Sequence, residues 1–176
     1  MIPLNTKLQY RFDQLEEDRI RLLDALSKYP ETRFDYKSEP TRWSINQILI
    51  HLLTSEQLTL AYLKKKSLGI NQLRNSGPIE SVKITLLTIF QRMPFKFKAP
   101  TLVAQHTPNP VPLRDLAERW SLSRIELKQF LESIHANNVH KLIFKHPVAG
   151  RFDAVQCLIF MREHFRHHVP QINRLL

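Results

Sequence analysis

Glycine, cysteine and long apolar runs are all scarce in this chain, and each shortage argues against a class of protein. Only three of the 176 residues are glycine, which disfavours a turn-rich β-sandwich and suits long uninterrupted helices. The single cysteine, Cys157, cannot form an internal disulfide, as expected in a reducing compartment. No stretch approaches the roughly 18–20 apolar residues that span a bilayer, and the N-terminus shows no signal-peptide pattern. We therefore expect an all-α cytoplasmic protein without a membrane segment.

The remaining composition is that of an ordinary globular protein. Hydrophobic residues make up 43% of the chain and charged residues 24%, and the length suits a single domain covering residues 1–176. Lysine and arginine outnumber aspartate and glutamate by 26 to 16, which gives a formal net charge of +10. Such a charge favours anionic partners. The basic residues are spread out, however, so a solvated basic surface explains them better than a nucleic-acid interface.

Apolar residues recur every three or four positions in four main segments, the spacing of amphipathic helices. Two of these helices have clear starts, because Ser44 with Gln47 and Asp153 with Gln156 form capping boxes. The expected helices cover residues 4–29, 44–66, 113–134 and 153–176. We interpret the long connection at 67–112 as a crossover with a short helix over 79–90 and a proline-rich extended part, and residues 144–150 as a loop.

Two histidines in the last helix have the spacing of metal ligands. His164 and His168 are four residues apart, so their side chains lie one above the other about one helical turn apart. Two imidazoles in that arrangement can bind one divalent ion at about 2.0–2.1 Å per zinc–nitrogen bond. The same face carries Cys157 and Ile172, which indicates that it points inward, whereas His167 falls on a flank and is not assigned as a ligand.

A third histidine can reach the same place if the helices are suitably ordered. His51 lies on the apolar side of the second helix, seven residues after Ser44. If the crossover leaves the second and third helices parallel, the second and fourth are antiparallel. At 1.5 Å rise per residue, His51 then comes level with His164 and His168. The sequence therefore predicts one divalent metal bound by these three histidines.

Two motifs resemble those of a known family. Residues 43–52, from Trp43 to Leu52, resemble the first-ligand motif of the DinB-like superfamily, which includes the YfiT-type bacillithiol transferases. His146-Pro147 with Gly150, followed by the His164/His168 pair and Gln171, is similar to its C-terminal motif. The resemblance spans essentially the whole chain. It implies an up-down-down-up four-helix bundle with a three-histidine zinc or nickel site, and relatives suggest a homodimer.

A site of this kind suggests a chemistry. Three protein ligands leave at least one coordination position open, as in catalytic metal sites, where the pKa of water or of a thiol falls. The resemblance adds that some relatives conjugate low-molecular-weight thiols to electrophiles. We therefore expect a metal-dependent enzyme acting on a small-molecule substrate, either a thiol S-transferase or a hydrolase.

The catalytic residues and the substrate are not identified by the sequence. Glu56 and Glu163 are interpreted as solvated helix residues rather than general bases, and Cys157 as a packed core thiol. The alternatives are a non-catalytic, stress-related metal-binding module, a helical bundle whose histidines are merely buried, and, least favoured, a basic nucleic-acid-binding bundle.

Overall fold

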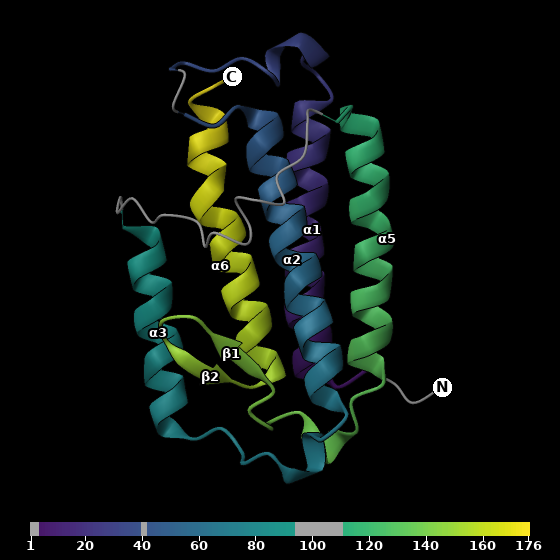
Figure 1. Ribbon diagram of the computed structural model, residues 1–176, viewed down its shortest axis with the longest axis vertical. Helices are drawn as coiled ribbons and strands as arrows, with labels where there is room; N and C mark the ends of the chain where they lie inside the picture. The colour runs from purple at the N-terminus through teal and green to yellow at the C-terminus, as the bar shows by residue number, and fades with distance from the viewer. Residues whose placement is uncertain (1–3, 40–41, 94–110) are drawn as a thin grey trace.

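The computed structural model describes residues 4–39, 42–93 and 111–176, and within them the chain is mostly helical, as predicted (Figure 1). The extended part predicted for the crossover lies largely at 94–110, outside the described residues. Among the described helices, none is both long enough and apolar enough to cross a membrane. The described part contains five α-helices, namely α1 (Thr6–Leu26), α2 (Ile45–Ser67), α3 (Pro78–Arg92), α5 (Leu113–Glu132) and α6 (Ala154–Asn173).

The two predicted capping boxes set the starts of α2 and α6. The Ser44 hydroxyl accepts the Gln47 amide proton, and the Gln47 side chain accepts from the Ser44 amide. Asp153 and Gln156 make the same reciprocal pair at α6. Since each box satisfies amide donors that have no intrahelical partner, the sequence fixes where both site-bearing helices begin.

Side-chain contacts define how the helices run relative to one another. At the starts of α2 and α5, the Asn46 side chain donates to the Val111 carbonyl oxygen at 2.7 Å. Near the ends of the same helices, Lys64 pairs with Glu126, so α2 and α5 are parallel. In α6, the N-terminal half packs beside the far end of α2, and His164 approaches His51 near the start of α2. The helices α2 and α6 are therefore antiparallel.

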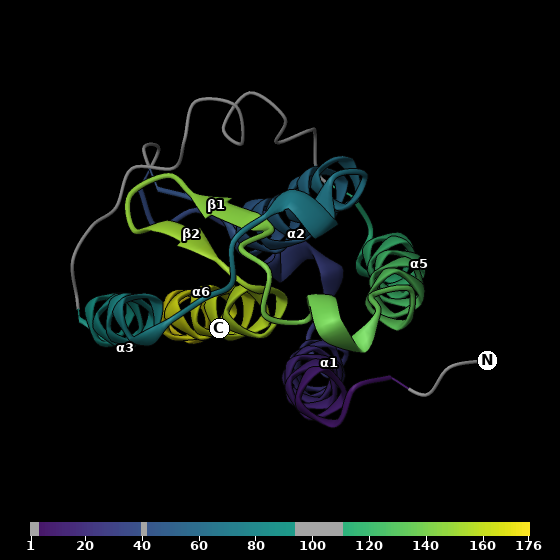
Figure 2. The same ribbon diagram turned by 90° about the horizontal axis from the view of Figure 1, so that it is seen from below.

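The helix α3 lies outside the other four and packs along α6 (Figure 2). Arg92, the last residue of α3, donates from Nε and Nη2 to the Glu163 carboxylate on α6 at 2.8 and 2.9 Å. Figure 2 shows a small hairpin over α3 and α6, facing α2. This hairpin consists of β1 (Phe144–His146) and β2 (Gly150–Phe152), which pair antiparallel.

The hairpin corrects the loop predicted at 144–150. Strands of three residues are too short to show an alternating pattern that sequence analysis can separate from a loop. Only the turn between them, at Pro147 to Ala149, matches the prediction. The correction matters for the site because it gives His146 a fixed position against α6.

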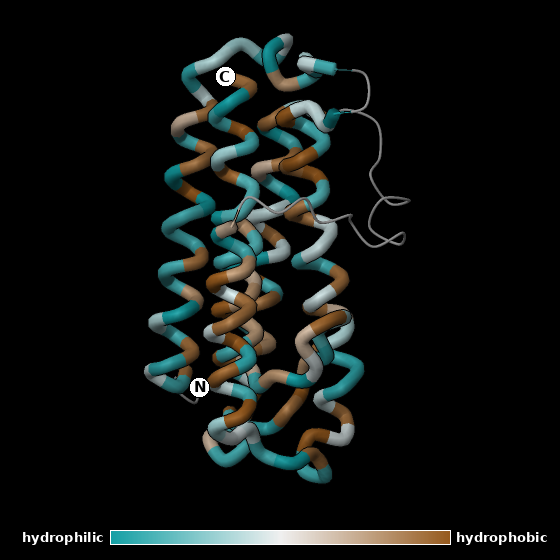
Figure 3. The backbone as a smooth tube through the Cα atoms, turned by 90° about the vertical axis from the view of Figure 1, so that its left-hand side faces the viewer, coloured by the Kyte–Doolittle hydropathy of each residue, from teal (hydrophilic) through white to brown (hydrophobic). Residues whose placement is uncertain are grey.

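The core forms two apolar clusters separated by buried polar side chains. Along each helix, apolar residues alternate with polar ones (Figure 3), which is how an amphipathic helix buries one face. The cluster nearer the hairpin includes Leu15, Leu63 and Phe152, and the other includes Ile48, Trp120 and Phe165. In each of α1, α2, α5 and α6, a buried charged residue falls in sequence between the members of the two clusters, and these residues are Arg19, Glu56, Arg124 and Glu163.

Candidate metal centre

Three histidines from α2 and α6 meet between the two helices. His51 Nε2 lies 3.2 Å from His164 Nε2. One nitrogen from each of His51, His164 and His168 can be chosen so that all three lie within 4.8 Å of one another. His51 and His168 are only 3% and 8% exposed. The structure thus brings together the three residues that the sequence singled out, and they could hold a metal ion.

The spacing of these nitrogens fits a divalent ion. Two nitrogens bonded to one tetrahedral zinc at about 2.0–2.1 Å stand roughly 3.3–3.4 Å apart. The 3.2 Å between His51 Nε2 and His164 Nε2 is close to that value. The three imidazole rings also meet edge to face, with centroids 4.9–5.2 Å apart, so several nitrogens converge without the rings stacking over one another.

Burial keeps all three imidazoles uncharged. It lowers the pKa of His51 to about 4 and is the largest cause of the fall in the pKa of His168 to about 3. The pKa of His164 is also lowered well below its ordinary value, first by burial and then by the neighbouring histidines. Since a histidine binds metal only in its neutral form, the cluster is in the ligand form at neutral pH.

A hydrogen bond from outside the three-histidine cluster orients His168, whereas the hydrogen-bond contact of the His51 ring is with His164, inside the cluster. His168 Nδ1 donates to Gln171 Oε1, 3.1 Å away and one turn further along α6, which leaves the Nε2 lone pair free to bind metal. His51 Nδ1 is buried and has no hydrogen-bond partner among the described residues. Packing must therefore hold the His51 ring in place.

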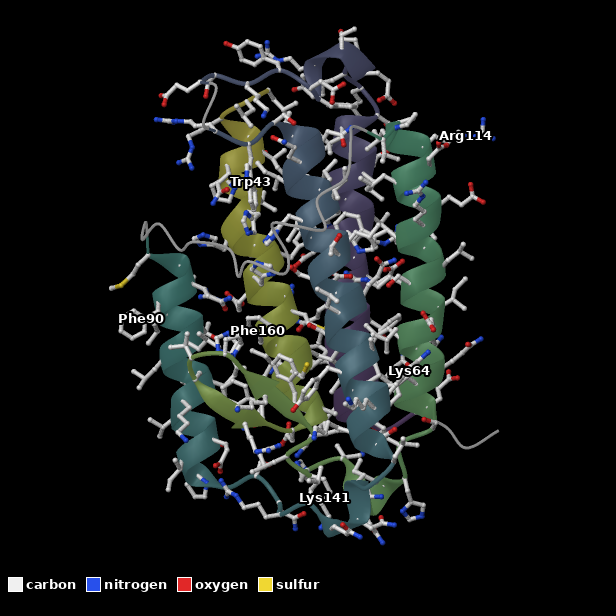
Figure 4. The ribbon with its side chains drawn as sticks, viewed as in Figure 1. Trp43, Lys64, Phe90, Arg114, Lys141 and Phe160 are labelled. Carbon is white, nitrogen blue, oxygen red and sulfur yellow. The ribbon has the colours of Figure 1, made fainter. Side chains whose placement is uncertain are left out.

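Two aromatic side chains flank the cluster (Figure 4). The Trp43 ring lies 4.8 Å from that of His51 and 6.4 Å, nearly parallel, from that of His168. Phe160 stacks on His164 at 5.8 Å with an interplanar angle of 12°. In Figure 4 Trp43 lies towards the C-terminal end of α6 and Phe160 towards the hairpin. Trp43 begins the segment that resembles the first-ligand motif, and Phe160 lies one turn before His164, but spacing alone does not show that their rings contact the histidines.

The interpretation of Glu56 and Glu163 as solvated residues is wrong. Glu56 is 5% exposed and accepts hydrogen bonds from Trp120 and Arg124. Glu163 is 6% exposed and is held by Arg92. Helical periodicity indicates the face on which a residue lies, but it does not show that an arginine from another helix reaches it. Both carboxylates are bound by arginine side chains.

Cys157 and His167 agree with their predicted roles outside the cluster. Cys157 is 1% exposed, and burial, with a smaller contribution from the charge of Asp153, raises the pKa of its thiol, as expected of a core residue. His167 Nδ1 lies 2.7 Å from the Gln91 carbonyl oxygen on α3. Its ring also contacts that of His168 edge to face at 5.2 Å, but His167 is not one of the three residues whose nitrogens converge.

The fold and the cluster define a helical protein with a candidate metal centre between two antiparallel helices. Comparison with family models is more specific, because residues 14–172 match the model of the DinB superfamily. The chain therefore belongs to that superfamily, as its motifs indicated. A search of curated proteins and a search of solved structures each found no match.

Proposed function

We propose that this protein is a metal-dependent enzyme in which His51, His164 and His168 bind one zinc or nickel ion and a small thiol attacks an electrophilic substrate. The observation that carries the proposal is the convergence of three neutral histidines from two helices, of which His51 and His168 are buried and His164 is half-buried. Three protein ligands leave coordination positions open, which is the arrangement of catalytic metal sites. Membership of the DinB superfamily supports the same reading.

The surrounding side chains have definable roles in this proposal. Gln171 holds the His168 ring with its Nε2 directed at the ion, and Trp43 and Phe160 restrict water on two sides. A bound divalent ion would supply Lewis acidity that lowers the pKa of a thiol or of water at an open position. In the transfer, the thiol loses its proton to solvent, its sulfur bonds to the electrophilic carbon, and the leaving group departs with its electron pair.

The pairing of the nearest acidic residues with arginines, in the part of the chain that the structure describes, favours a thiol over water as the nucleophile. Glu56 and Glu163 are the acidic residues next in sequence to the ligands on these helices, and both are bound to arginines. A thiol has a pKa of about 8.5, compared with about 15.7 for water, so it needs much less help to lose its proton. Hydrolysis is therefore the second choice at this site.

We also infer a single domain, residues 1–176, in which α1, α2, α5 and α6 form the up-down-down-up bundle and α3 is an addition on the crossover. A homodimer fits the outer face of α3. Five exposed apolar residues follow one another there at alternating intervals of three and four positions, the spacing of a helix–helix seam. We call them the α3 stripe, which consists of Ile79, Val82, Leu86, Ile89 and Met93.

The test of the proposed function begins with metal content. Protein purified without chelators or an affinity tag is analysed for zinc and nickel beside His51→Ala and His168→Ala, with His135→Ala as the control, since His135 is exposed and distant in sequence. We expect near-stoichiometric metal in the parent and control and loss of metal in the other two variants. No metal in the parent after reconstitution would overturn the proposal.

Turnover is tested next. The metal-loaded protein is presented with 2-mercaptoethanol, cysteine or 3-mercaptopropionate and an electrophilic aryl halide, and conjugate formation is followed by absorbance. We expect metal-dependent conjugation that His168→Ala abolishes. Tight metal binding without turnover would instead indicate the non-catalytic metal-binding module.

A further inference from the structure

The inner face of the hairpin continues the wall of the candidate metal centre. Lys145 and Arg151 lie on the exposed outer face, whereas His146 and its cross-strand partner Gly150 lie on the inner one. The His146 ring contacts the Phe160 ring edge to face at 4.7 Å. Since Phe160 also stacks on His164, one aromatic ring contacts both His146 and a member of the three-histidine cluster.

Hydrogen bonds fix which nitrogen of His146 carries a proton. Its Nδ1 accepts the backbone N–H groups of Val148 at 3.2 Å and Ala149 at 3.0 Å. Burial lowers the pKa of His146 to about 4, so the ring is neutral at pH 7. A neutral imidazole that accepts at Nδ1 must donate at Nε2. No group in the described ranges accepts the Nε2 proton of His146. This nitrogen is also not among the buried side-chain atoms that lack a hydrogen-bond partner.

A lysine from α3 reaches the same face of the hairpin. Lys83 Nζ lies 3.7 Å from the point where a Cβ on Gly150 would stand. Directly opposed residues have their Cβ positions roughly 4.5–5.5 Å apart on one face, so the Lys83 ammonium group and His146 lie on the same face of the hairpin, both close to Gly150. Gly150 has φ +90°, a conformation suited to glycine.

Lys83 has no acidic partner in the part of the chain that the structure describes. It is half-buried and makes no ion pair there. The acidic residues of α3 and of the facing part of α6 form ion pairs with other residues: Glu80 with Arg74, and Glu163 with Arg92. A half-buried ammonium without a carboxylate leaves a position for an anion from outside the chain.

We propose that Lys83 and His146 form an anion-binding subsite beside the three-histidine cluster, and that it takes the carboxylate of the small thiol. The Lys83 ammonium group supplies the charge, and His146 Nε2 donates a hydrogen bond to a carboxylate oxygen. This inference rests on the proposed function for the identity of the ligand, but not for the existence of the subsite. It gives the enzyme a preference for acidic thiols over neutral ones.

Cobalt-substituted protein tests the preference, because thiol binding at cobalt produces a charge-transfer absorption band. The probes are 3-mercaptopropionate and 2-mercaptoethanol, of which only the first carries a carboxylate. We expect the parent to bind the acidic thiol roughly tenfold more tightly or better, as a charge-assisted hydrogen bond predicts. Lys83→Met should remove most of that difference and leave the affinity for 2-mercaptoethanol unchanged.

The matched control is Lys145→Met, which removes the same charge from the outer face of the same hairpin. It should keep the preference, and His146→Phe should reduce it without loss of cobalt. Equal binding of both thiols by the parent would overturn the subsite. An equal loss in Lys145→Met and Lys83→Met would also overturn it, since the preference would then reflect overall charge alone.

A second measurement separates the subsite from the metal chemistry. Propionate is titrated into metal-free, ¹⁵N-labelled protein while the imidazole nitrogens of His146 are observed by NMR. We expect a saturable shift that Lys83→Met abolishes. If this shift occurs but no thiol binds the cobalt protein, the proposed function fails and the subsite stands. If thiols bind but propionate causes no saturable shift, the subsite fails and the proposed function stands.

Discussion

At the candidate metal centre, some side chains orient the metal-binding histidines without binding the metal themselves. Gln171 is the clearest case, because its Oε1 accepts from His168 Nδ1 at 3.1 Å and so directs the opposite nitrogen towards the cluster. His51 has no such partner among the described residues. The two ligands are therefore positioned by different means, one by a hydrogen bond and the other by packing against Trp43.

Replacement of Gln171 should weaken metal binding without removing a ligand. For Gln171→Ala we expect an affinity for zinc about 10–100-fold lower, since the loss of an outer hydrogen bond to a metal-binding histidine typically costs that much. Competition with a chromophoric chelator measures it. The control is Gln57→Ala on the exposed side of α2, which should bind zinc like the parent. Unchanged affinity in Gln171→Ala would contradict the role of this hydrogen bond.

For single residues, the sequence predicted the contacts that depend on the spacing of residues along one helix or on the position where a helix begins. The pair His164 and His168 follows from the four-residue interval, and His51 was placed from an assumed helix order. The bonds of Glu56 to Arg124 and of Glu163 to Arg92 join separate helices. No local pattern encodes such a meeting, because it depends on how far apart the helices pack and on long, flexible arginine side chains.

Among the secondary-structure elements, α6 is the one on which the site depends most. Its N-cap, Asp153, is 3% exposed. One carboxylate oxygen accepts the Gln156 amide at 2.8 Å, and the other accepts the Ser76 hydroxyl at 2.6 Å. A single side chain thus starts α6 and also ties it to the segment that leads into α3.

Loss of this cap should destabilise the whole fold. For Asp153→Ala we expect the free energy of unfolding to fall by about 1–3 kcal/mol, because a helix cap and a buried hydroxyl both lose their acceptor. Urea denaturation measures it. Asp24→Ala is the control, since Asp24 is exposed and, among the residues that the structure describes, its carboxylate pairs only with Lys28, across 3.6 Å. It should change stability by less than about 0.5 kcal/mol. Equal effects of the two variants would refute the argument.

Helix starts were the most predictable feature of the elements, and the hairpin the least. Capping boxes are local in sequence, so Ser44 and Asp153 located α2 and α6 correctly. The short helix expected over 79–90 is present as α3. Its packing against α6, outside the other helices, is a property of the tertiary structure that its own sequence pattern does not determine.

Across the whole molecule, the buried histidines should make the metal-free protein sensitive to acid. Burial lowers the pKa of His51 and of His146 to about 4, from the ordinary value of 6.5. Between these values the unfolded chain binds protons that the folded chain does not. The free energy of unfolding is therefore fully retained above pH 6.5 and falls as the pH drops towards 4, by up to about 1.4 kcal/mol per pH unit for each such histidine.

Thermal unfolding of metal-free protein at pH 7.5, 6.5, 5.5 and 4.5 measures this dependence. We expect a steady loss of stability below pH 6.5, and a shallower loss in His51→Leu, in which one depressed histidine is absent. A profile that is flat from pH 7.5 to 4.5 would show that these imidazoles titrate normally in the folded protein.

The α3 stripe is a row of exposed apolar residues, and it predicts the assembly state. Its members are 41–66% exposed, and α3 carries more exposed large apolar side chains than any other described helix. Alternating three- and four-residue intervals keep such a stripe on one side of a helix. A second copy is the partner that covers both stripes at once, since a two-fold axis brings the same surface of each chain together.

We therefore expect light scattering to give a mass of twice the 20.8 kDa of one chain for the parent, and a single-chain mass for Leu86→Glu, which places a charge in the centre of the stripe. Leu122→Glu is the matched control, because Leu122 on α5 is also exposed, at 60%, but lies outside the stripe; it should stay dimeric. Circular dichroism checks that each variant remains helical. A parent that is monomeric at about 100 μM, or a control that dissociates equally, would reject pairing through α3.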